Sequence, residues 1–405
     1  MQCDVVIFGG GVAGLWLLDT LVERGQSAVL LEAGDLGSGQ TVASQGIIHG
    51  GLKYTLQGLL TSSAANIAEM PGLWRECLHG RRTPDLSQTR VRSEHCHLWR
   101  TDSIASRMGM IGAKFGLRVA PQTVANDERP EALRHCPGDV ARLDEQVISP
   151  ASLIANFATR HAGRLLKIDP TGVRFTANAS GIDRIHLSPR DASYEALTFE
   201  SRFVVFSAGA GNASLREQVG LSPRAMQRRP LHMLMVRGHS LPVLNGHCVD
   251  GSRTRVTVTS DVDSAGRTVW QVGGQIAEEG VGLDPHTLIE RGRRELEAAI
   301  PRLDLSQAEF ATYRVDRAEA VTAGGRRPES FQVLRDGNVF TAWPTKLVLA
   351  PVLAESLAAS LTSEGRSSKR SLPSFSQWPA PKVALPPWEA VTAWHAASTG
   401  ARRAA

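Results

Sequence analysis

The sequence predicts an α/β fold in which a Rossmann-like domain is interwoven with an α+β domain built on an antiparallel sheet. Residues 4–32 read as a buried strand, a glycine turn, a helix and a second buried strand, which is how a parallel sheet opens. Residues 231–271 contain strand-type runs separated by a short polar turn, which is typical of antiparallel pairing. Residues 203–206 form a further apolar strand, so the first domain resumes after an interruption.

The elements of the first domain follow from apolar runs and their spacing. Residues 5–8 are Val, Val, Ile and Phe, and glycines occupy positions 9–11. Leucines at helical spacing extend to Gly25, and residues 28–31 form a second strand that ends in Glu32. Residues 147–162 are predicted to be helical after Pro150.

The second domain and the end of the chain are predicted in the same way. Strands are expected at 231–236, 254–259 and 268–271, a helix at 285–300, a hairpin at 331–341 and a last helix at 347–361. We assign 1–82, 145–225 and 320–361 to the first domain and 83–144 and 226–319 to the second. Residues 362–405 form a basic tail rich in Pro and Ser, in which Trp378, Trp388 and Trp394 predict partial docking on the body.

Composition excludes several classes of protein. No apolar run approaches the roughly 20 residues that span a bilayer, and no signal peptide is visible, so we expect a cytoplasmic protein, free or peripheral to a membrane. Five scattered cysteines without a Cys-x-x-Cys pair predict reduced thiols, and the consecutive His95, Cys96 and His97 cannot all face one metal ion. The net charge is +5, of which the tail carries +4, so a nucleic-acid partner is not expected.

A glycine fingerprint indicates a dinucleotide site. Gly9, Gly11 and Gly14 form GxGxxG between the first strand and the first helix, and Glu32 ends the second strand. Gly9 permits the tight turn, Gly11 admits a pyrophosphate to the helix N-terminus, and Gly14 permits close helix packing. Glu32 can accept hydrogen bonds from ribose hydroxyls. The pattern alone serves both NAD and FAD.

Three further segments favour FAD. Residues 41–54, TVASQGIIHGGLKY, resemble the flavin-contacting loop of the D-amino-acid oxidase superfamily, and are most similar to FAD-dependent glycerol-3-phosphate dehydrogenases and L-2-hydroxyglutarate dehydrogenases. FVVFSAGAGN at 203–212 and WPTKLVLAP at 343–351 resemble later blocks of that superfamily. The resemblance implies non-covalent FAD held by Gly9, Gly11, Val12, Ala13, Gly14, Glu32, Ala33, Ser44, Gln45, Gly46, Ile47, Val173, Ala208, Gly209, Pro344, Thr345, Lys346 and Leu347.

Four residues are candidates for catalytic roles. Arg314 occupies the place at which relatives that oxidise amino acids hold the substrate carboxylate, although Arg317, Arg326 and Arg327 compete for that role. Lys346 is expected at the flavin pyrimidine edge, where a cation stabilises the charge of reduced flavin. His49 follows the flavin loop and His232 lies on a predicted strand of the second domain, so either could take a substrate proton.

The resulting functional prediction is an FAD-dependent dehydrogenase or oxidase. Its substrate is expected to be small and anionic, with a hydroxyl or amine beside the C–H bond from which hydride passes to flavin N5. Oxygen and a quinone remain open as electron acceptors. Two other readings stay open: a flavin enzyme that acts on a macromolecule such as modified tRNA or a peptide, and a flavin-binding protein without catalysis.

Overall fold

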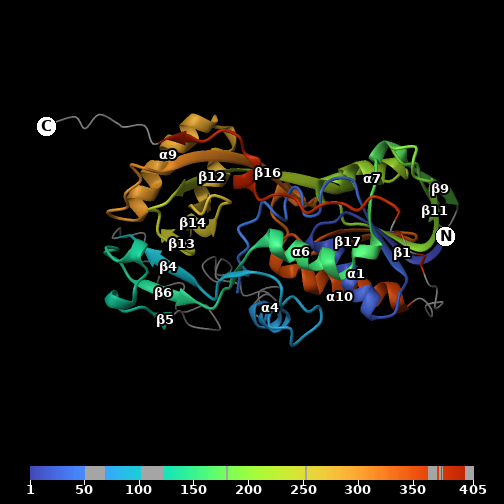
Figure 1. The fold of residues 1–405 in the computed structure, drawn as a ribbon, viewed down its shortest axis with the longest axis horizontal. Coiled ribbons are helices and arrows are strands. Elements are labelled where there is room, and N and C mark those ends of the chain that lie inside the picture. The colour runs from blue at the N-terminus through green and yellow to red at the C-terminus, as the bar shows by residue number, and fades with distance from the viewer. Residues whose placement is uncertain are drawn as a thin grey trace.

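The protein is built on two sheets at opposite ends of an elongated molecule (Figure 1). This architecture is that of a computed structural model. It describes residues 1–50, 69–101, 122–178, 181–250, 253–363, 372–373, 375 and 377–396. A two-stranded pairing of β3 (Val91–Ser93) with β7 (Val147–Ile148) accompanies the two sheets.

The first sheet has the parallel core that the opening residues predict. Its strands run in the order β17-β18-β11-β1-β2-β8, with β10 paired to β11 and β9 to β10. The pairs β18–β11, β11–β1, β1–β2 and β2–β8 are parallel. Its strands are β1 (Gln2–Phe8), β2 (Ala28–Glu32), β8 (Leu165–Lys167), β9 (Val173–Asn178), β10 (Gly181–Leu187), β11 (Leu197–Phe206), β17 (Gln332–Asp336) and β18 (Val339–Trp343).

Helices cover one face of this sheet because both β1 and the first helix present apolar side chains. Val5 and Ile7 pack in one core cluster with Leu15, Trp16 and Leu18. The residues at 6 and 8 point to the opposite face and join a second cluster. The covering helices are α1 (Val12–Glu23), α4 (Met70–Leu78), α6 (Pro150–Arg160) and α10 (Ala350–Ser363).

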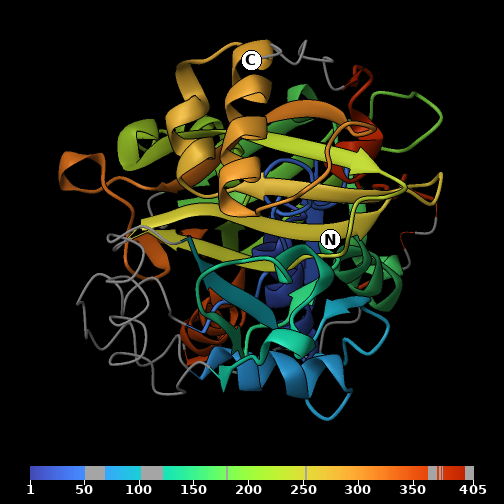
Figure 2. The ribbon, with the colours of Figure 1, turned by 90° about the vertical axis from the view of Figure 1, so that its left-hand side faces the viewer.

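The second sheet has the strand order β19-β16-β12-β15-β14-β13-β4-β6-β5. Its neighbours are antiparallel except β13 and β4, which run parallel. Figure 2 views this sheet with α9 (Pro285–Ala299) packed on it. The strands are β4 (Cys96–Arg100), β5 (Gln122–Thr123), β6 (Val140–Leu143), β12 (Met226–Gly238), β13 (Gly246–Asp250), β14 (Arg253–Val262), β15 (Thr268–Gly273), β16 (Glu309–Ala320) and β19 (His395–Ala396).

The observed elements follow the predicted ones with differences at their ends. Residues 147–162 divide into β7 and α6, whose N-terminus is capped by the Ser149 side chain. A 3₁₀ turn at Leu347–Leu349 precedes α10, so the last helix starts three residues later than predicted. Two short helices, α7 (Asn212–Gln218) and α8 (Gln275–Glu279), follow β11 and β15.

The described part of the C-terminal segment contacts both sheets. Phe375 and Trp378 join the core cluster beneath the first sheet. The short helix α11 (Pro387–Ala390) carries Trp388 into a cluster with Met235 of β12, and β19 pairs with the edge strand β16. Within the described residues, no helix has the length and apolar character needed to cross a membrane.

Candidate functional site

β1 and α1 pack so closely at their junction that neither Gly9 in the turn nor Gly14 in the helix has room for a side chain. Gly9 has φ +108°, and a Cβ there would lie 2.5 Å from the Ala208 backbone. A Cβ on Gly14 would lie 2.0 Å from the Gly9 carbonyl oxygen. The turn therefore brings the N-terminus of α1 against the end of β11, where Ala208 and the αL residue Gly209 (φ +56°) follow the strand.

The N-terminus of α1 is available to an anion. Gly11 is its N-cap and offers no side-chain acceptor, and no acidic residue lies in the first turn. Val12 and Ala13 begin the helix, and the Val12 amide donates to Thr41 Oγ1 at 3.2 Å. Backbone N–H groups and the positive end of the helix dipole suit a pyrophosphate there.

Glu32 is held at the end of β2 by the backbone. Its two carboxylate oxygens accept hydrogen bonds from the amides of Gly10 and Gly34, each at 2.5 Å. These contacts fix the carboxylate beside the glycine turn, where the fingerprint expects it. Ala33 follows and lines a second cavity with Lys167, Ile168 and Trp378. Val173 lies nearby, buried at the start of β9.

A cavity of about 250 Å³ opens where the two sheets meet. Its walls come from the segment after β2, from the turn before α10, and from strands and a helix of the second sheet. The lining includes Gln40, Ala43, Ser44, Gln45, Gly46, Ile47, His49, Leu231, Met233, His247, Thr257, Glu278, Val315, Arg317, Arg327, Thr345, Lys346 and Leu347. Most of the flavin-loop and closing-segment residues expected from the sequence thus meet in one place.

The segment 43–46 is fixed by hydrogen bonds with the second sheet and with β3. Tyr313 donates its hydroxyl to the Ala43 carbonyl at 2.8 Å. Gln45 Nε2 donates to the carbonyls of Thr257 and Gln271 at 3.1 and 3.0 Å, so this side chain anchors the loop. Arg92 donates to the Gln45 carbonyl at 2.5 Å, and burial lowers the pKa of Arg92 to about 10. The loop is preorganised before any ligand binds.

Two small residues of this loop have different reasons for being small. Gly46 has φ +71°, and a Cβ there would lie 2.1 Å from the Ile148 carbonyl oxygen, so the protein backbone itself requires glycine at this position. Ser44 lines the cavity, and its buried Oγ has no hydrogen-bond partner among the described residues. Ser44 is therefore the loop side chain available to a polar ligand.

The closing turn brings a cation to the same cavity. Thr345 has φ +63°, and its hydroxyl donates to the Ser330 carbonyl at 3.0 Å. Lys346 is 7% exposed, and its Nζ donates to the Glu329 carbonyl at 3.3 Å. Together with Leu347, these residues form the wall opposite the second sheet. A buried ammonium there gives the cavity positive character.

Two arginines reach the cavity from neighbouring segments. Arg317 on β16 donates to Glu278 at 3.1 Å and to the Arg229 carbonyl at 3.4 Å. Burial, reinforced by the charge of Arg317, lowers the pKa of Arg327 to about 10. Arg327 Nε is buried and has no hydrogen-bond partner in the described part of the chain.

Arg314 and His232 do not line the cavity, which goes against the roles expected for them. They are paired across β12 and β16 and share the face turned towards α8 and the 3₁₀ turn after it. Arg314 donates to the carbonyls of Val281 and Leu283 at 2.7 and 2.9 Å. His232 Nδ1 lies 3.2 Å from the Gly280 carbonyl oxygen. Their neighbours at alternate positions face the cavity instead, because successive strand residues point to opposite faces.

His49 meets two residues that the sequence did not single out. Its Nδ1 lies 3.5 Å from Glu145 Oε2, and His247 Nε2 lies 3.5 Å from the same oxygen. Among the described residues, these three side chains form a group whose possible ligand atoms lie within 4.8 Å of one another. Glu145 precedes the two-residue strand β7, and His247 lies on the five-residue strand β13, so neither belongs to a run long enough to show periodicity. His95 and His97, which were rejected from the sequence as a metal site, lie elsewhere, on β4 and immediately before it.

These features fit FAD. The glycine turn and the helix N-terminus suit the pyrophosphate, the carboxylate of Glu32 suits a ribose, and the unpartnered Ser44 hydroxyl and the Lys346 ammonium suit the polar edge of a flavin. The remaining part of the expected flavin loop, 51–54, lies outside the described residues.

Comparison with known proteins agrees with this reading. The family of FAD dependent oxidoreductases called DAO matches residues 4–350. A probable FAD-dependent oxidoreductase of Pseudomonas aeruginosa is 39% identical over 395 residues, which cover 96% of this chain and 98% of that protein. A crystal structure of an FAD dependent oxidoreductase from that organism superposes with a TM-score of 0.81 at 37% identity, covering 96% of this chain and 98% of the other.

More distant relatives share the fold or one segment. The L-α-glycerophosphate oxidase of Mycoplasma pneumoniae is 14% identical and superposes with a TM-score of 0.59, over 92% of this chain and 99% of that one. Glycerol-3-phosphate dehydrogenase 1 of Mycobacterium tuberculosis is 34% identical over 83 residues, which are 20% of this chain and 15% of that protein.

Proposed function

Since the chain belongs to the DAO family of FAD-dependent oxidoreductases, we propose that it oxidises a small anionic hydroxy or amino compound at the C–H bond beside its hydroxyl or amine. When bound, FAD supplies the two-electron acceptor that takes the hydride. The chain's own residues bind the anion, orient the substrate and take its proton.

The guanidinium of Arg327 is the observation that carries this proposal. It lines the cavity with a buried Nε that lacks a hydrogen-bond partner among the described residues, and its neighbour Arg317 has the same charge. A buried cation in this setting is stabilised by an incoming anion, and the planar fork of arginine suits a carboxylate or phosphate. We assign the anchoring role to Arg327, with Arg317 as its second contact, in place of Arg314.

His49 supplies the base in this proposal. It lines the same cavity, and 48% of its side chain is exposed. Desolvation inside the cavity lowers the pKa of His49, and the neighbouring Glu145 carboxylate opposes that shift only in part. A neutral imidazole at neutral pH can accept the proton of a hydroxyl or an ammonium group.

The experiment is an anaerobic screen of the FAD-loaded protein against 2-hydroxy acids, amino acids and polyol phosphates. We expect an anionic member of one class to abolish the visible flavin absorbance, and uncharged analogues such as the matching esters to leave it unchanged. Exposing the reduced protein to oxygen or to a soluble quinone then identifies the acceptor.

An esterified substrate that reduces the flavin as fast as the free anion would contradict the anchoring role. A flavin that no small donor reduces would contradict the proposed function. Retention on RNA with a steep salt dependence, in place of reduction by small donors, would point instead to a macromolecular substrate.

A further inference from the structure

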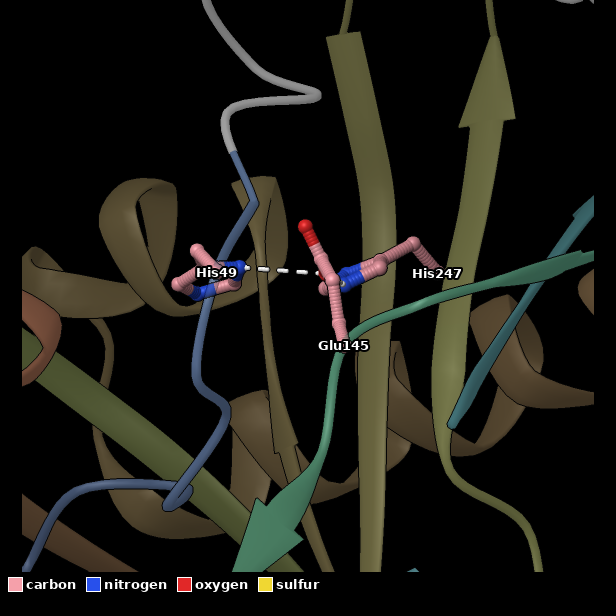
Figure 3. Close-up of side chains that lie close together, drawn as sticks. All are labelled: His49, Glu145 and His247. Carbon is pink, nitrogen blue, oxygen red and sulfur yellow. Dashed lines mark ion pairs between the residues drawn. The ribbon is translucent and has the colours of Figure 1, made fainter. Parts of the chain in front are cut away.

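Glu145 lies between two imidazoles at the edge of the cavity (Figure 3). It comes from the loop between β6 and β7, whereas His49 follows β2 and His247 lies on β13. The side chains of Glu145 and His247 are 4% and 6% exposed, whereas that of His49 is 48% exposed. One buried carboxylate thus lies between a buried imidazole and a half-exposed one.

The hydrogen bonds around this group determine where the protons lie. Glu145 Oε1 accepts the Gly50 amide at 2.7 Å, which leaves Oε2 for the two imidazoles. The hydroxyl of Thr257 lies 2.9 Å from His247 Nδ1, so it can donate there and leave the His247 proton on Nε2, which points at Glu145. Burial alone would raise the pKa of Glu145, but the two imidazoles beside its carboxylate outweigh burial and hold the pKa well below its ordinary value.

A carboxylate beside Nδ1 dictates the tautomer of His49. An ionised carboxylate only accepts hydrogen bonds, so the proton of neutral His49 belongs on Nδ1. The Nε2 lone pair is then free. When Nε2 takes a proton, the adjacent carboxylate stabilises the imidazolium that forms, which is the logic of a carboxylate that orients a catalytic histidine.

We propose that Glu145 is a positioning residue that keeps the proton of His49 on Nδ1, and that His247 holds Glu145 in that role. This inference rests on the proposed function. In the oxidation of an alcohol, the substrate O–H proton passes to His49 Nε2, the hydride of the adjacent C–H leaves to FAD, and a C=O bond forms. The substrate loses two electrons and the cofactor gains them.

The charged surroundings reinforce this arrangement. Arg327 lines the cavity with His49, and its charge opposes a positive charge on the His49 ring. Cys96 lies behind Glu145, where burial raises the pKa of its thiol well above the ordinary value, so the thiol stays neutral. Within the described residues, Glu145 is the acid that meets both imidazoles.

The test reads the tautomer directly by NMR of the FAD-loaded protein with ¹⁵N-labelled histidine. The His49 signal is assigned by its loss in His49→Asn. We expect the wild-type ring to carry its proton on Nδ1. In Glu145→Gln the amide NH₂ can donate to Nδ1, so we expect the proton to move to Nε2. Glu145→Asp keeps a carboxylate and should restore part of the Nδ1–H form. His286→Gln, on the exposed surface of α9, is the matched control.

The kinetic arm measures anaerobic flavin reduction by the donor found in the screen. Glu145→Gln is expected to lower the limiting rate about 10²–10⁴-fold, the range for loss of a positioned general base, while substrate affinity changes little. His247→Gln removes the imidazole that holds Glu145 in place, so we expect it to reproduce part of the rate loss of Glu145→Gln.

Three results would overturn the inference. The first is an Nε2–H tautomer in the wild-type protein, or a tautomer that Glu145→Gln leaves unchanged. The second is wild-type flavin reduction in Glu145→Gln, which would leave the proposed function standing. The third is a metal ion that is bound in stoichiometric amount, survives dialysis, and is lost in Glu145→Gln and His247→Gln. The metal would then occupy His49 Nδ1 and His247 Nε2, the nitrogens to which the inference assigns protons. An Nδ1–H tautomer without any oxidised donor would instead refute the proposed function alone.

Discussion

Gly14 packs directly against Gly9, so that a Cβ on Gly14 would lie 2.0 Å from the carbonyl oxygen of Gly9. Even the methyl group of Gly14→Ala must therefore displace α1 from the end of β1, and with it the helix N-terminus that faces the pyrophosphate. We expect Gly14→Ala to bind FAD at least about tenfold more weakly, a loss of about 1.4 kcal/mol or more, and to be purified with less FAD than wild type. Gly163→Ala, where a Cβ meets open space, should keep its FAD. The flavin-to-protein absorbance ratio measures both.

Arg327 and Arg314 form a matched pair for testing the anion site. Arg327→Lys keeps a charge but loses the planar fork, so we expect substrate to bind about 10–100-fold more weakly while FAD content stays the same. Arg314→Lys loses contacts to two carbonyls outside the cavity and should lower Tm without changing flavin reduction. Anaerobic reduction rates at several substrate concentrations, with thermal melts, distinguish the two. The opposite assignment of effects would return the anchor to Arg314.

The flavin is expected to be released by acid. His49 Nδ1 faces Glu145 rather than open space, and the loop follows the non-covalent pattern. Precipitation with acid should leave FAD in the supernatant and a colourless pellet. A yellow pellet that becomes colourless in His49→Ala would show a histidyl link instead.

His97 should make the protein less stable in mild acid. Burial, together with the charges of His95 and Arg142, lowers the pKa of His97 to about 4. Between that value and the ordinary value of about 6.5, the unfolded chain binds a proton that the folded protein does not, so the free energy of unfolding falls as pH falls through this window. His97→Gln removes this proton uptake, because glutamine does not titrate. In urea titrations, we expect the free energy of unfolding to fall between pH 7 and pH 4.5 in both proteins, by about 1–3 kcal/mol less in the variant than in wild type. Equal losses would contradict the assignment.

The sequence predicted the first sheet better than the site. β1, α1 and β2 have apolar runs with clear turn signals and were expected within a few residues, whereas only the apolar end of β11, 203–206, was expected, because its first six residues are mostly polar. The direction of side chains on β12 and β16 could not be predicted, because both faces of β12 are buried. Leu234 packs under α9 and Met235 packs under the C-terminal segment, so no alternation of polar and apolar residues shows which face meets the cavity.

The group of His49, Glu145 and His247 shows a second limit of prediction from sequence. His49 was found through its local motif, but Glu145 and His247 join it only through pairings between distant segments, such as the bridge of Ile47 with Val147 and the alignment of β13 beside β4. Sequence spacing of about a hundred residues between each of the three carries no geometric information.

The C-terminal segment has a consequence for how substrate enters. Trp378 donates its indole N–H to the Lys167 carbonyl under the first sheet, Val383 bridges to Leu36, and His395 pairs with Phe310 at the edge of the second sheet. This segment therefore contacts the first sheet, the segment after β2 and the second sheet in turn, and so connects the two ends of the molecule (Figure 1). A hinge motion that separated the two sheets would have to remove Trp388 from its cluster with Met235 and unpair β19 from β16. Entry of substrate into the cavity therefore depends on local rearrangement of the residues at its opening. Cutting the chain between Val383 and Trp388 should let the two sheets move relative to each other without removing a residue that lines the cavity.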